Sequence, residues 1–151
     1  IKALIYGNGE WIEHHEALSP EDVLEKMQTC DVGLLPSYAE TYGYSVLEFQ
    51  ACGRPVITTN VRAFPEINSD DRGWLIPVDK QEIGGEAYFR TDQDRATLSA
   101  AIRAGLINAF EDILANPRQI REKGGRALTH ILSHHNHKEF GQSLEALYRR
   151  G

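Results

Sequence analysis

The chain has 151 residues, 41% of them hydrophobic, which is enough to build the core of one domain. Its 16 Lys and Arg residues against 22 Asp and Glu residues give a net charge of −6, which disfavours a protein whose main task is to bind nucleic acid. Cys30 and Cys52 lack the paired spacing of a disulfide framework or a zinc site, and the absence of both a signal peptide and an apolar run of ~18 residues predicts a cytoplasmic protein without a transmembrane segment.

The first half of the chain alternates short apolar runs with helical patterns. Apolar runs flanked by turn residues predict buried strands at residues 3–6, 32–36, 55–59 and 73–78. A weaker strand candidate covers residues 11–15. The connection between this candidate and the first strand, residues 7–11, is far shorter than the dozen or so residues that a parallel crossover needs. The two segments therefore pair as a hairpin, or the crossover between them has been shortened.

Helices are predicted between the strands and throughout the C-terminal part. The stretch Ser-Pro-Glu-Asp at residues 19–22 marks a helix start, because it offers a capping hydroxyl, a proline at the first helical position and two carboxylates. The next helix runs from about residue 43 to 52 and stops at Gly53. Beyond a polar excursion at residues 79–94, three further helices are predicted, over about 93–116, 118–132 and 138–150.

Strand, helix and strand in this order predict an α/β fold with right-handed crossovers. We expect a parallel sheet of about five strands flanked by helices, followed by an all-helical C-terminal segment. The chain opens directly on a strand-like run without a methionine, so we also expect it to be a piece of a longer protein.

Two glutamates stand out in the middle of this pattern. Glu48 interrupts an apolar helical run, and Glu40 precedes it by eight residues, in the loop before the helix. At ~1.5 Å per residue the two lie up to ~12 Å apart along the helix axis. Between them, the free N–H groups of the first helical turn form an anion site, and Gly43 lets a ligand approach the backbone. The loop follows a strand, so it lies at the carboxyl edge of the sheet, where open α/β folds bind ligands.

One extended ligand would use all of these features, with a diphosphate at the helix start and hydroxyl-rich groups at either end. Because a carboxylate accepts two hydroxyl donors well, a ribose at one glutamate and a sugar at the other describe a nucleotide sugar. Spacing alone leaves two other interpretations open. In the first, Glu48 is simply a solvent-facing residue of the helix and Glu40 is an exposed loop residue without a role. In the second, the two are the carboxylate pair of a glycosidase, which requires carboxylates ~5–9.5 Å apart.

The stretch PSYAETYGYSVLEFQACGRPVITT, residues 36–59, resembles the signature region of group 1 retaining glycosyltransferases, which include sucrose-phosphate synthases and mannosyltransferases. These enzymes have two Rossmann-like domains (the GT-B architecture), and the C-terminal one carries the motif E-x7-E, here Glu40 to Glu48. The stretches CDVGLLPS, FPEI and RGWLIPV resemble neighbouring elements of that domain. The resemblance implies that residues 1–151 are a single Rossmann-like nucleotide-sugar-binding domain, the C-terminal half of a two-domain enzyme.

The resemblance also implies roles for individual residues. Glu48 would hold the ribose and Glu40 the hydroxyls of the transferred sugar, while the backbone of Thr41, Tyr42 and Gly43 would face the sugar and the diphosphate. Transfer would proceed by displacement on the front face of the donor, without a protein nucleophile, a cofactor or a metal ion.

Further residues match less specific parts of the family. His14, His15 and Ala17 correspond to a strand-end loop beside the base, and Gly7 and Gly9 to a glycine pair near the donor cleft. The implied partners are a UDP- or GDP-sugar donor, an unknown acceptor (glycan, lipid or small molecule) and the missing N-terminal domain of the same chain.

Two features of the sequence depart from the family's pattern. Arg62 and Ala63 stand near the position of two glycines, and Arg62 either offers its charge to a phosphate or is a solvated surface arginine. The basic diphosphate-binding pair of the family and its acceptor domain would lie upstream of residue 1, so the chain alone is expected to be inactive. A non-catalytic nucleotide- or nucleotide-sugar-binding module of the same fold is the alternative function, and a sugar-nucleotide epimerase is disfavoured by the E-x7-E motif.

Overall fold

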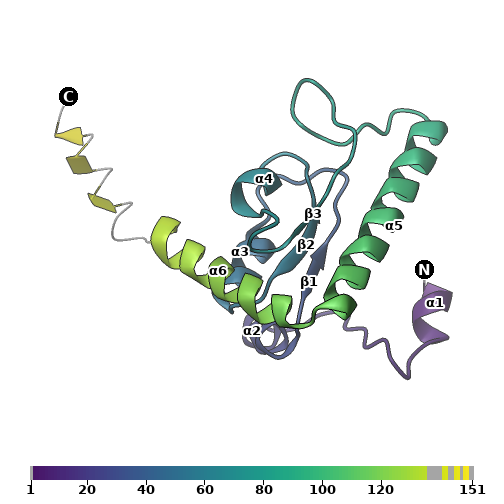
Figure 1. Ribbon diagram of the computed structural model, residues 1–151, viewed down its shortest axis with the longest axis horizontal. Helices are drawn as coiled ribbons and strands as arrows, with labels where there is room; N and C mark the ends of the chain where they lie inside the picture. The colour runs from purple at the N-terminus through teal and green to yellow at the C-terminus, as the bar shows by residue number, and fades with distance from the viewer. Residues whose placement is uncertain (1, 136–140, 143–144, 147, 150–151) are drawn as a thin grey trace.

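A parallel sheet of three strands, in the order β1-β2-β3, lies at the centre of the computed structural model (Figure 1). The structure describes residues 2–135, 141–142, 145–146 and 148–149. The strands are β1 (Gly33–Leu35), β2 (Val56–Thr59) and β3 (Trp74–Ile76). In the register of the sheet Leu34 lies opposite Ile57, and Thr58 lies opposite Leu75. The predicted parallel α/β sheet is thus confirmed for its three central strands.

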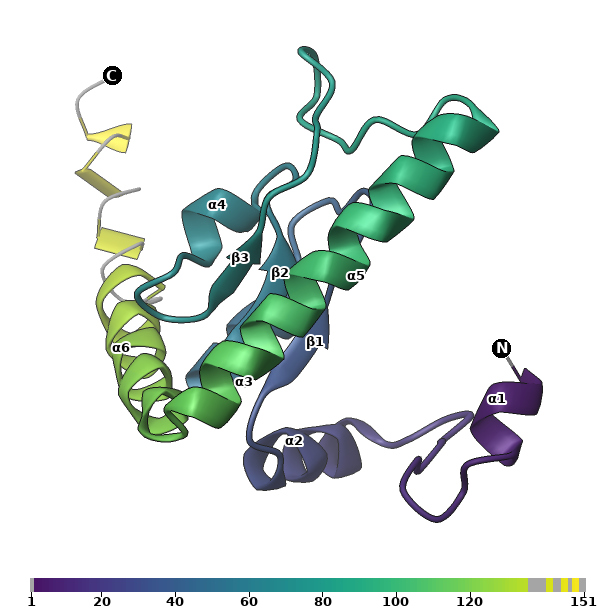
Figure 2. The same ribbon diagram turned by 45° about the vertical axis from the view of Figure 1, so that its right-hand side comes forward.

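Helices cover both faces of the sheet. On one face α3 (Tyr44–Ala51) packs against β1 and β2, and both α2 (Pro20–Thr29) and α6 (Arg118–His134) contact α3. The long α5 (Asp92–Ala115) crosses the other face, as Figure 2 shows. The core between these layers is apolar and includes Val46, Val56, Ile57, Phe64, Ile76, Leu98, Ile102 and Ile113.

The predicted number of strands, about five, is wrong because the two N-terminal candidates are not strands. Residues 3–6 fall in a short helix, α1 (Lys2–Tyr6), and residues 11–15 form an irregular segment. The N–H of Gly7 donates to the Ala3 carbonyl at 3.0 Å, and the Asn8 side chain donates to the Leu4 carbonyl at 2.7 Å. These hydrogen bonds within the segment satisfy backbone groups without a strand partner. The residues between the two strand candidates are too few for the crossover that parallel pairing requires.

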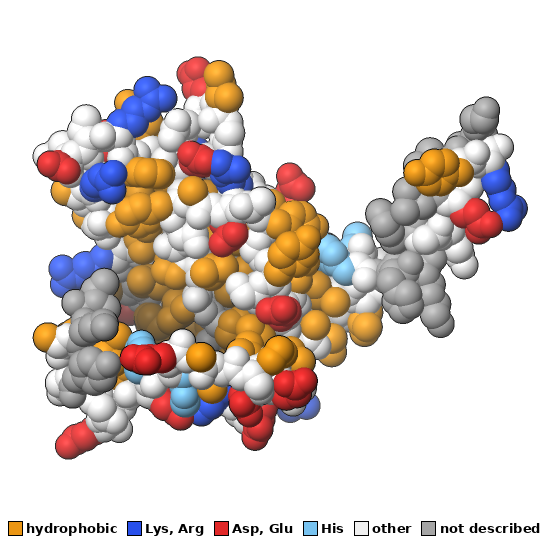
Figure 3. Space-filling model, turned by 180° about the vertical axis from the view of Figure 1, so that it is seen from behind, with side chains coloured by type: hydrophobic (Ala, Val, Ile, Leu, Met, Phe, Trp, Pro, Cys, Tyr) orange, Lys and Arg blue, Asp and Glu red, His pale blue; other side chains and the backbone are white. Residues whose placement is uncertain are grey.

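The two outer strands of the sheet have different edges. At β3 the Leu75 N–H donates to the Asp70 carboxylate at 3.0 Å, which closes this edge. At β1 the side chain of Leu34 is 49% exposed, and no other strand in the described part of the chain pairs with its outer edge. Seen from behind, the molecule shows hydrophobic side chains over much of its surface (Figure 3).

The helix boundaries follow the predicted start and stop signals. Ser19 caps α2 by accepting the Asp22 N–H at 3.1 Å, and Thr91 and Asp94 form a capping box at the start of α5. The short helix α4 (Phe64–Ile67) follows β2. The helix predicted at residues 138–150 lies largely outside the described residues. None of the described helices combines the length and the apolar composition needed to cross a bilayer.

Candidate functional site

The loops that follow β1 and β2 meet at the carboxyl edge of the sheet. Residues 36–43 connect β1 to α3, residues 60–63 connect β2 to α4, and both lie at the upper end of the sheet in Figure 2. The Thr59 hydroxyl ties them together by donating to the Ser37 carbonyl at 2.6 Å. They enclose a hollow of about 190 Å³ lined by Ala39, Glu40, Thr41 and Arg62. The structure thus brings two of the predicted site residues, Glu40 and Thr41, into one concave surface at the expected edge.

Glu40 is half-buried in the wall of this hollow. Its Oε1 accepts the backbone N–H of Thr41 at 2.8 Å, which holds the carboxylate against its own loop. A carboxylate offers about four acceptor sites, so this bond leaves most of them available to hydroxyl donors.

Gly43 forms the turn between the loop and α3. It is the N-cap of the helix, with φ 85°, and a Cβ added there would lie 2.4 Å from the Phe64 Cε1. The positive φ and the tight packing against Phe64 therefore both require a glycine here, in addition to the close ligand approach predicted from the sequence. Gly43 provides no side-chain cap, and the Val46 N–H donates to the Gly43 carbonyl at 2.9 Å. The N–H groups of Tyr44 and Ser45 therefore remain at the open end, together with the positive end of the helix dipole.

Glu48 lies on the second turn of α3, on the side opposite to the core. Val46 and Gln50 occupy the buried side of this helix, whereas Glu48 is exposed. It lies four residues after Tyr44, which corresponds to ~6 Å along the helix axis. The side chain is available to a ligand that extends from the helix start along the outer side of α3.

An aromatic pair flanks the helix start. The rings of Tyr42 and Tyr44 lie 5.3 Å apart, and their side chains are 36% and 72% exposed. Tyr42 was predicted only for its backbone, and Tyr44 was not predicted at all. The alternation Tyr-Gly-Tyr around a predicted helix start is the signal in the sequence that points to this pair.

The predicted N-terminal site residues lie away from the hollow. Gly7, Gly9, His14, His15 and Ala17 belong to the segment between α1 and α2, at the end of the sheet opposite to the loops after β1 and β2 (Figure 2). The structure does not bring these five residues together with Glu40 or α3.

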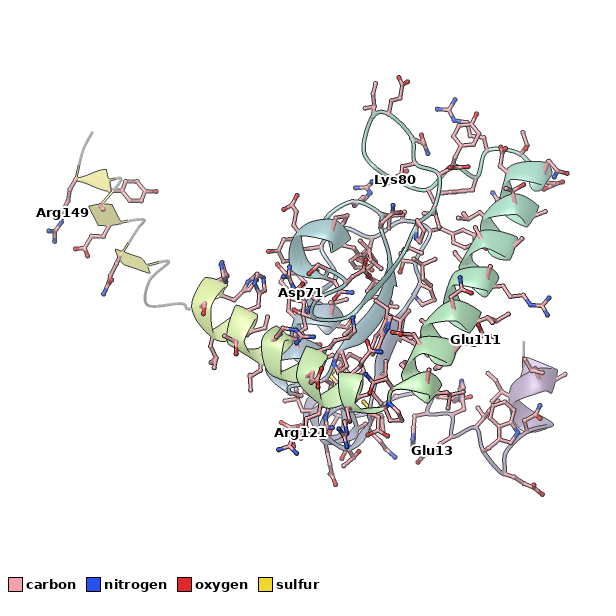
Figure 4. The ribbon with its side chains drawn as sticks, viewed as in Figure 1. Glu13, Asp71, Lys80, Glu111, Arg121 and Arg149 are labelled. Carbon is pink, nitrogen blue, oxygen red and sulfur yellow. The ribbon has the colours of Figure 1, made fainter. Side chains whose placement is uncertain are left out.

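An ion pair between Glu13 and Lys26 connects the N-terminal segment to α2. The Glu13 carboxylate lies 2.9 Å from the His15 Nε2 and accepts from the Lys26 Nζ at 2.8 Å. The hydrogen bond and the charge of Lys26 hold the pKa of the Glu13 carboxyl below its usual value. Figure 4 labels Glu13 at the lower end of the molecule and Lys80, in the loop after β3, at the upper end.

Arg62 is the cation that lines the hollow. It is also the one non-glycine residue with positive φ among those described, at 44°. Its N–H donates to the Gly85 carbonyl at 2.9 Å, and its guanidinium forms an ion pair with Glu86. Both partners belong to the polar excursion after β3, which is a loop closed by an antiparallel bridge between Lys80 and Ala87.

The histidines at the end of α6 pack on each other. The rings of His130 and His134 stack at 4.3 Å, and burial, with the nearby Arg72 charge, lowers the pKa of His130. Within the described ranges no three His, Cys, Asp or Glu side chains are grouped to hold a metal ion. His137, the last histidine of this cluster in the sequence, lies outside the described residues.

Comparison with known protein families identifies the family of this chain. The sequence profile described as "Glycosyl transferases group 1" matches residues 2–85, more than half of the chain. The chain belongs to this family. The match confirms the resemblance deduced from residues 36–59, and it includes Glu40, Glu48 and Arg62.

Individual group 1 glycosyltransferases align with the chain at moderate identity. The D-inositol 3-phosphate glycosyltransferase of Arthrobacter sp. (strain FB24) is 30% identical over 112 residues, which are 72% of this chain and 27% of that protein. The phosphatidyl-myo-inositol mannosyltransferase of Propionibacterium freudenreichii is 25% identical over 154 aligned positions, 98% of this chain and 35% of that protein. The chain therefore spans about a quarter to a third of the length of these relatives.

A solved structure shows the same fold. The sucrose-phosphate synthase of Thermosynechococcus elongatus superposes with a TM-score of 0.69 and 22% sequence identity, over 99% of this chain and 32% of that one. The superposition and the family match together identify a domain of a GT-B group 1 glycosyltransferase.

Proposed function

We propose that the chain is the donor-binding domain of a retaining glycosyltransferase. The full-length protein would move a sugar from a UDP- or GDP-sugar to an acceptor glycan, lipid or small molecule. The observation that carries this proposal is the hollow at the carboxyl edge, where Glu40 lies beside the open start of α3 in a chain of the group 1 family. The acceptor classes agree with the inositol phosphate and phosphatidylinositol in the names of two relatives.

The donor lies along the start of α3 in this proposal. The diphosphate binds the N–H groups of the first turn, and the backbone of Thr41, Tyr42 and Gly43 contacts the diphosphate and the sugar. Glu40 accepts hydroxyls of the transferred sugar, and Glu48 accepts those of the ribose. The domain contributes by orienting the donor and by stabilising the negative charge that develops on the departing diphosphate.

In this proposal the acceptor domain lies in the part of the full-length protein that the chain does not span, so we expect the isolated chain to bind nucleotides weakly and to transfer no sugar. A cytoplasmic location remains a prediction from the sequence. A non-catalytic nucleotide-binding module of the same fold is the alternative, and it predicts binding without transfer even in the full-length protein.

The experiment that tests the donor site is a titration of UDP, GDP and ADP, at millimolar concentrations, monitored by NMR. We expect amide shifts at residues 42–48 for at least one nucleotide, and their loss in a folded Glu48→Ala variant. Glu111→Ala serves as the matched control, because Glu111 is an exposed glutamate of α5 (Figure 4). Shifts that persist unchanged in Glu48→Ala would contradict the ribose role of Glu48.

A further inference from the structure

Arg62 stands at a junction of three loops at the carboxyl edge. It follows β2, it lines the hollow that Glu40 and Thr41 line from the β1 side, and it contacts the loop after β3. Its side chain is therefore placed where a ligand bound beside Glu40 would meet it.

The backbone and the guanidinium of Arg62 are both held in place. The N–H of Arg62 donates to the Gly85 carbonyl at 2.9 Å, and Gly85 itself has φ 64°. A Cβ added at Gly85 would lie 3.5 Å from the Arg62 nitrogen, so this contact between the loops is close along the backbone. The guanidinium pairs with the Glu86 carboxylate one residue further on. The loop after β3 thus fixes Arg62 without burying it, since its side chain is 37% exposed.

A diphosphate bound in the hollow needs a positively charged side chain nearby. A nucleoside diphosphate brings negative charge to a wall that already contains the Glu40 carboxylate, on a chain of net charge −6. Among the described residues that line the hollow, Arg62 alone carries positive charge. Lys80 lines a separate cavity between the loop after β3 and the start of α5. A guanidinium is also the side chain whose geometry best matches two phosphate oxygens at once.

We propose, on the basis of the donor site described above, that Arg62 binds the diphosphate of the donor and that Glu86 is its counter-ion in the ligand-free protein. The phosphate oxygens and the Glu86 carboxylate compete for the same guanidinium N–H groups. Glu86 therefore keeps Arg62 oriented while the site is empty and lowers the affinity of the site for the diphosphate.

Because Glu86 and the phosphate compete for Arg62, substitutions of Arg62 and of Glu86 should have opposite effects on diphosphate binding. Replacing Arg62 removes the positive charge that attracts the phosphate, whereas replacing Glu86 releases that charge. A merely structural ion pair gives effects of the same sign, because either substitution breaks the same contact. Binding measurements on the two variants therefore separate a ligand-binding arginine from a structural one.

The test compares the 151-residue chain with its Arg62→Gln and Glu86→Gln variants, using UDP, GDP, uridine and inorganic pyrophosphate as probes. We expect Arg62→Gln to weaken binding of the diphosphates about tenfold or more and to leave uridine unchanged. We expect Glu86→Gln to strengthen diphosphate binding about two- to fivefold. Arg118→Gln, an exposed arginine of α6, should bind like the wild type. The dispersion of amide signals verifies that each variant is folded.

The outcomes separate failure of this inference from failure of the donor site. Diphosphate binding that is equal in the wild type and Arg62→Gln overturns the role of Arg62 and leaves the donor site standing. Equal weakening in Arg62→Gln and Glu86→Gln overturns the counter-ion role and identifies a structural ion pair. Binding of pyrophosphate through Arg62, with no contribution from any nucleoside, supports the phosphate contact and contradicts the nucleotide-sugar proposal. Binding of no probe by the wild type overturns both.

Discussion

Gly43 and Phe64 approach so closely that a Cβ at Gly43 would lie 2.4 Å from the Phe64 Cε1. Gly43 starts α3 after the β1 loop, and Phe64 starts α4 after the β2 loop, so this contact locks the two loops that enclose the hollow. The shape of the candidate site therefore depends on the packing of Gly43 against Phe64, in addition to the ligand contact proposed for its backbone.

Replacing Gly43 by alanine is expected to lower the free energy of unfolding by about 2–3 kcal/mol, because the new Cβ meets a buried ring and the backbone has φ 85°. The matched control is Gly125→Ala, on the exposed side of α6, where a Cβ meets no atom within 4 Å. That substitution should raise stability by about 0.5–1 kcal/mol, since alanine favours a helix interior. Denaturant unfolding measures both, and similar effects in the two variants would contradict the packing argument.

Asn68 holds α4 to the sheet with its side-chain amide. Its Nδ2 donates to the Val56 carbonyl at 3.0 Å and to the Thr58 hydroxyl at 2.9 Å, and the residue is fully buried. We expect Asn68→Ala to cost about 2–3 kcal/mol, because it leaves buried acceptors without a donor. Asn108→Ala, at an exposed position of α5, should change stability by less than about 0.5 kcal/mol. Equal midpoints of chemical unfolding for the two variants would show that the buried network contributes nothing.

The central elements could be predicted because their signals are local. The apolar run at residues 55–59 lies between turn residues and is fully buried as β2, and Ser19 caps α2 as its sequence context predicted. The N-terminal run at residues 3–6 carries a similar apolar signal but forms α1. A strand needs a partner, and whether a partner is within reach depends on chain connectivity, which an apolar pattern does not encode.

The sequence predicts the site residues that belong to the E-x7-E motif. It does not predict those that are brought together by contacts between loops. Glu40 and Thr41 lie at the carboxyl edge, as the strand-loop-helix order indicated. The ion pair between Arg62 and Glu86 joins residues 24 positions apart, on loops whose approach is set by the sheet. No motif or regular spacing in the sequence predicts this pair, because it depends on how the two loops approach each other in the fold.

Acid should weaken the contact between Asp112 of α5 and Trp74 of β3. The Trp74 indole donates to the carboxylate at 2.8 Å, and this bond, followed by one from Gln119, lowers the pKa of Asp112 from its ordinary 3.8. Because the folded-state pKa is the lower one, the stabilisation is present above about pH 4 and is lost as the pH falls through the lowered value.

The expected size of this effect is less than about 1 kcal/mol, because solvent screens the exposed carboxylate. The measurement compares unfolding of the wild type and Asp112→Asn between pH 6 and pH 3. We expect the wild type to lose more stability than the variant on acidification. Parallel loss in both proteins would show that other carboxyl groups carry the dependence.

The two glutamates of the motif should affect different ligands. Glu48→Ala is expected to abolish binding of the free nucleotide and of the nucleotide sugar, because the ribose is common to both. Glu40→Ala is expected to weaken only the nucleotide sugar, by about tenfold, since its carboxylate accepts hydroxyls of the sugar. Calorimetric titration of UDP, UDP-glucose, GDP and GDP-mannose into both variants tests this division.

The Glu40→Ala substitution is more disruptive to the local structure than Glu48→Ala, so its binding data need a second variant as a control. Glu40 accepts the Thr41 N–H, so its removal can also loosen the loop, whereas Glu48 stands exposed on α3. Glu40→Gln keeps an acceptor oxygen for Thr41 while removing the charge, and it should show the same selective loss of the nucleotide sugar. Equal loss of the free nucleotide in the Glu40 and Glu48 variants would mean that both residues act on the nucleotide or on the fold, and the assignment of sugar and ribose to separate ends of the site would be wrong.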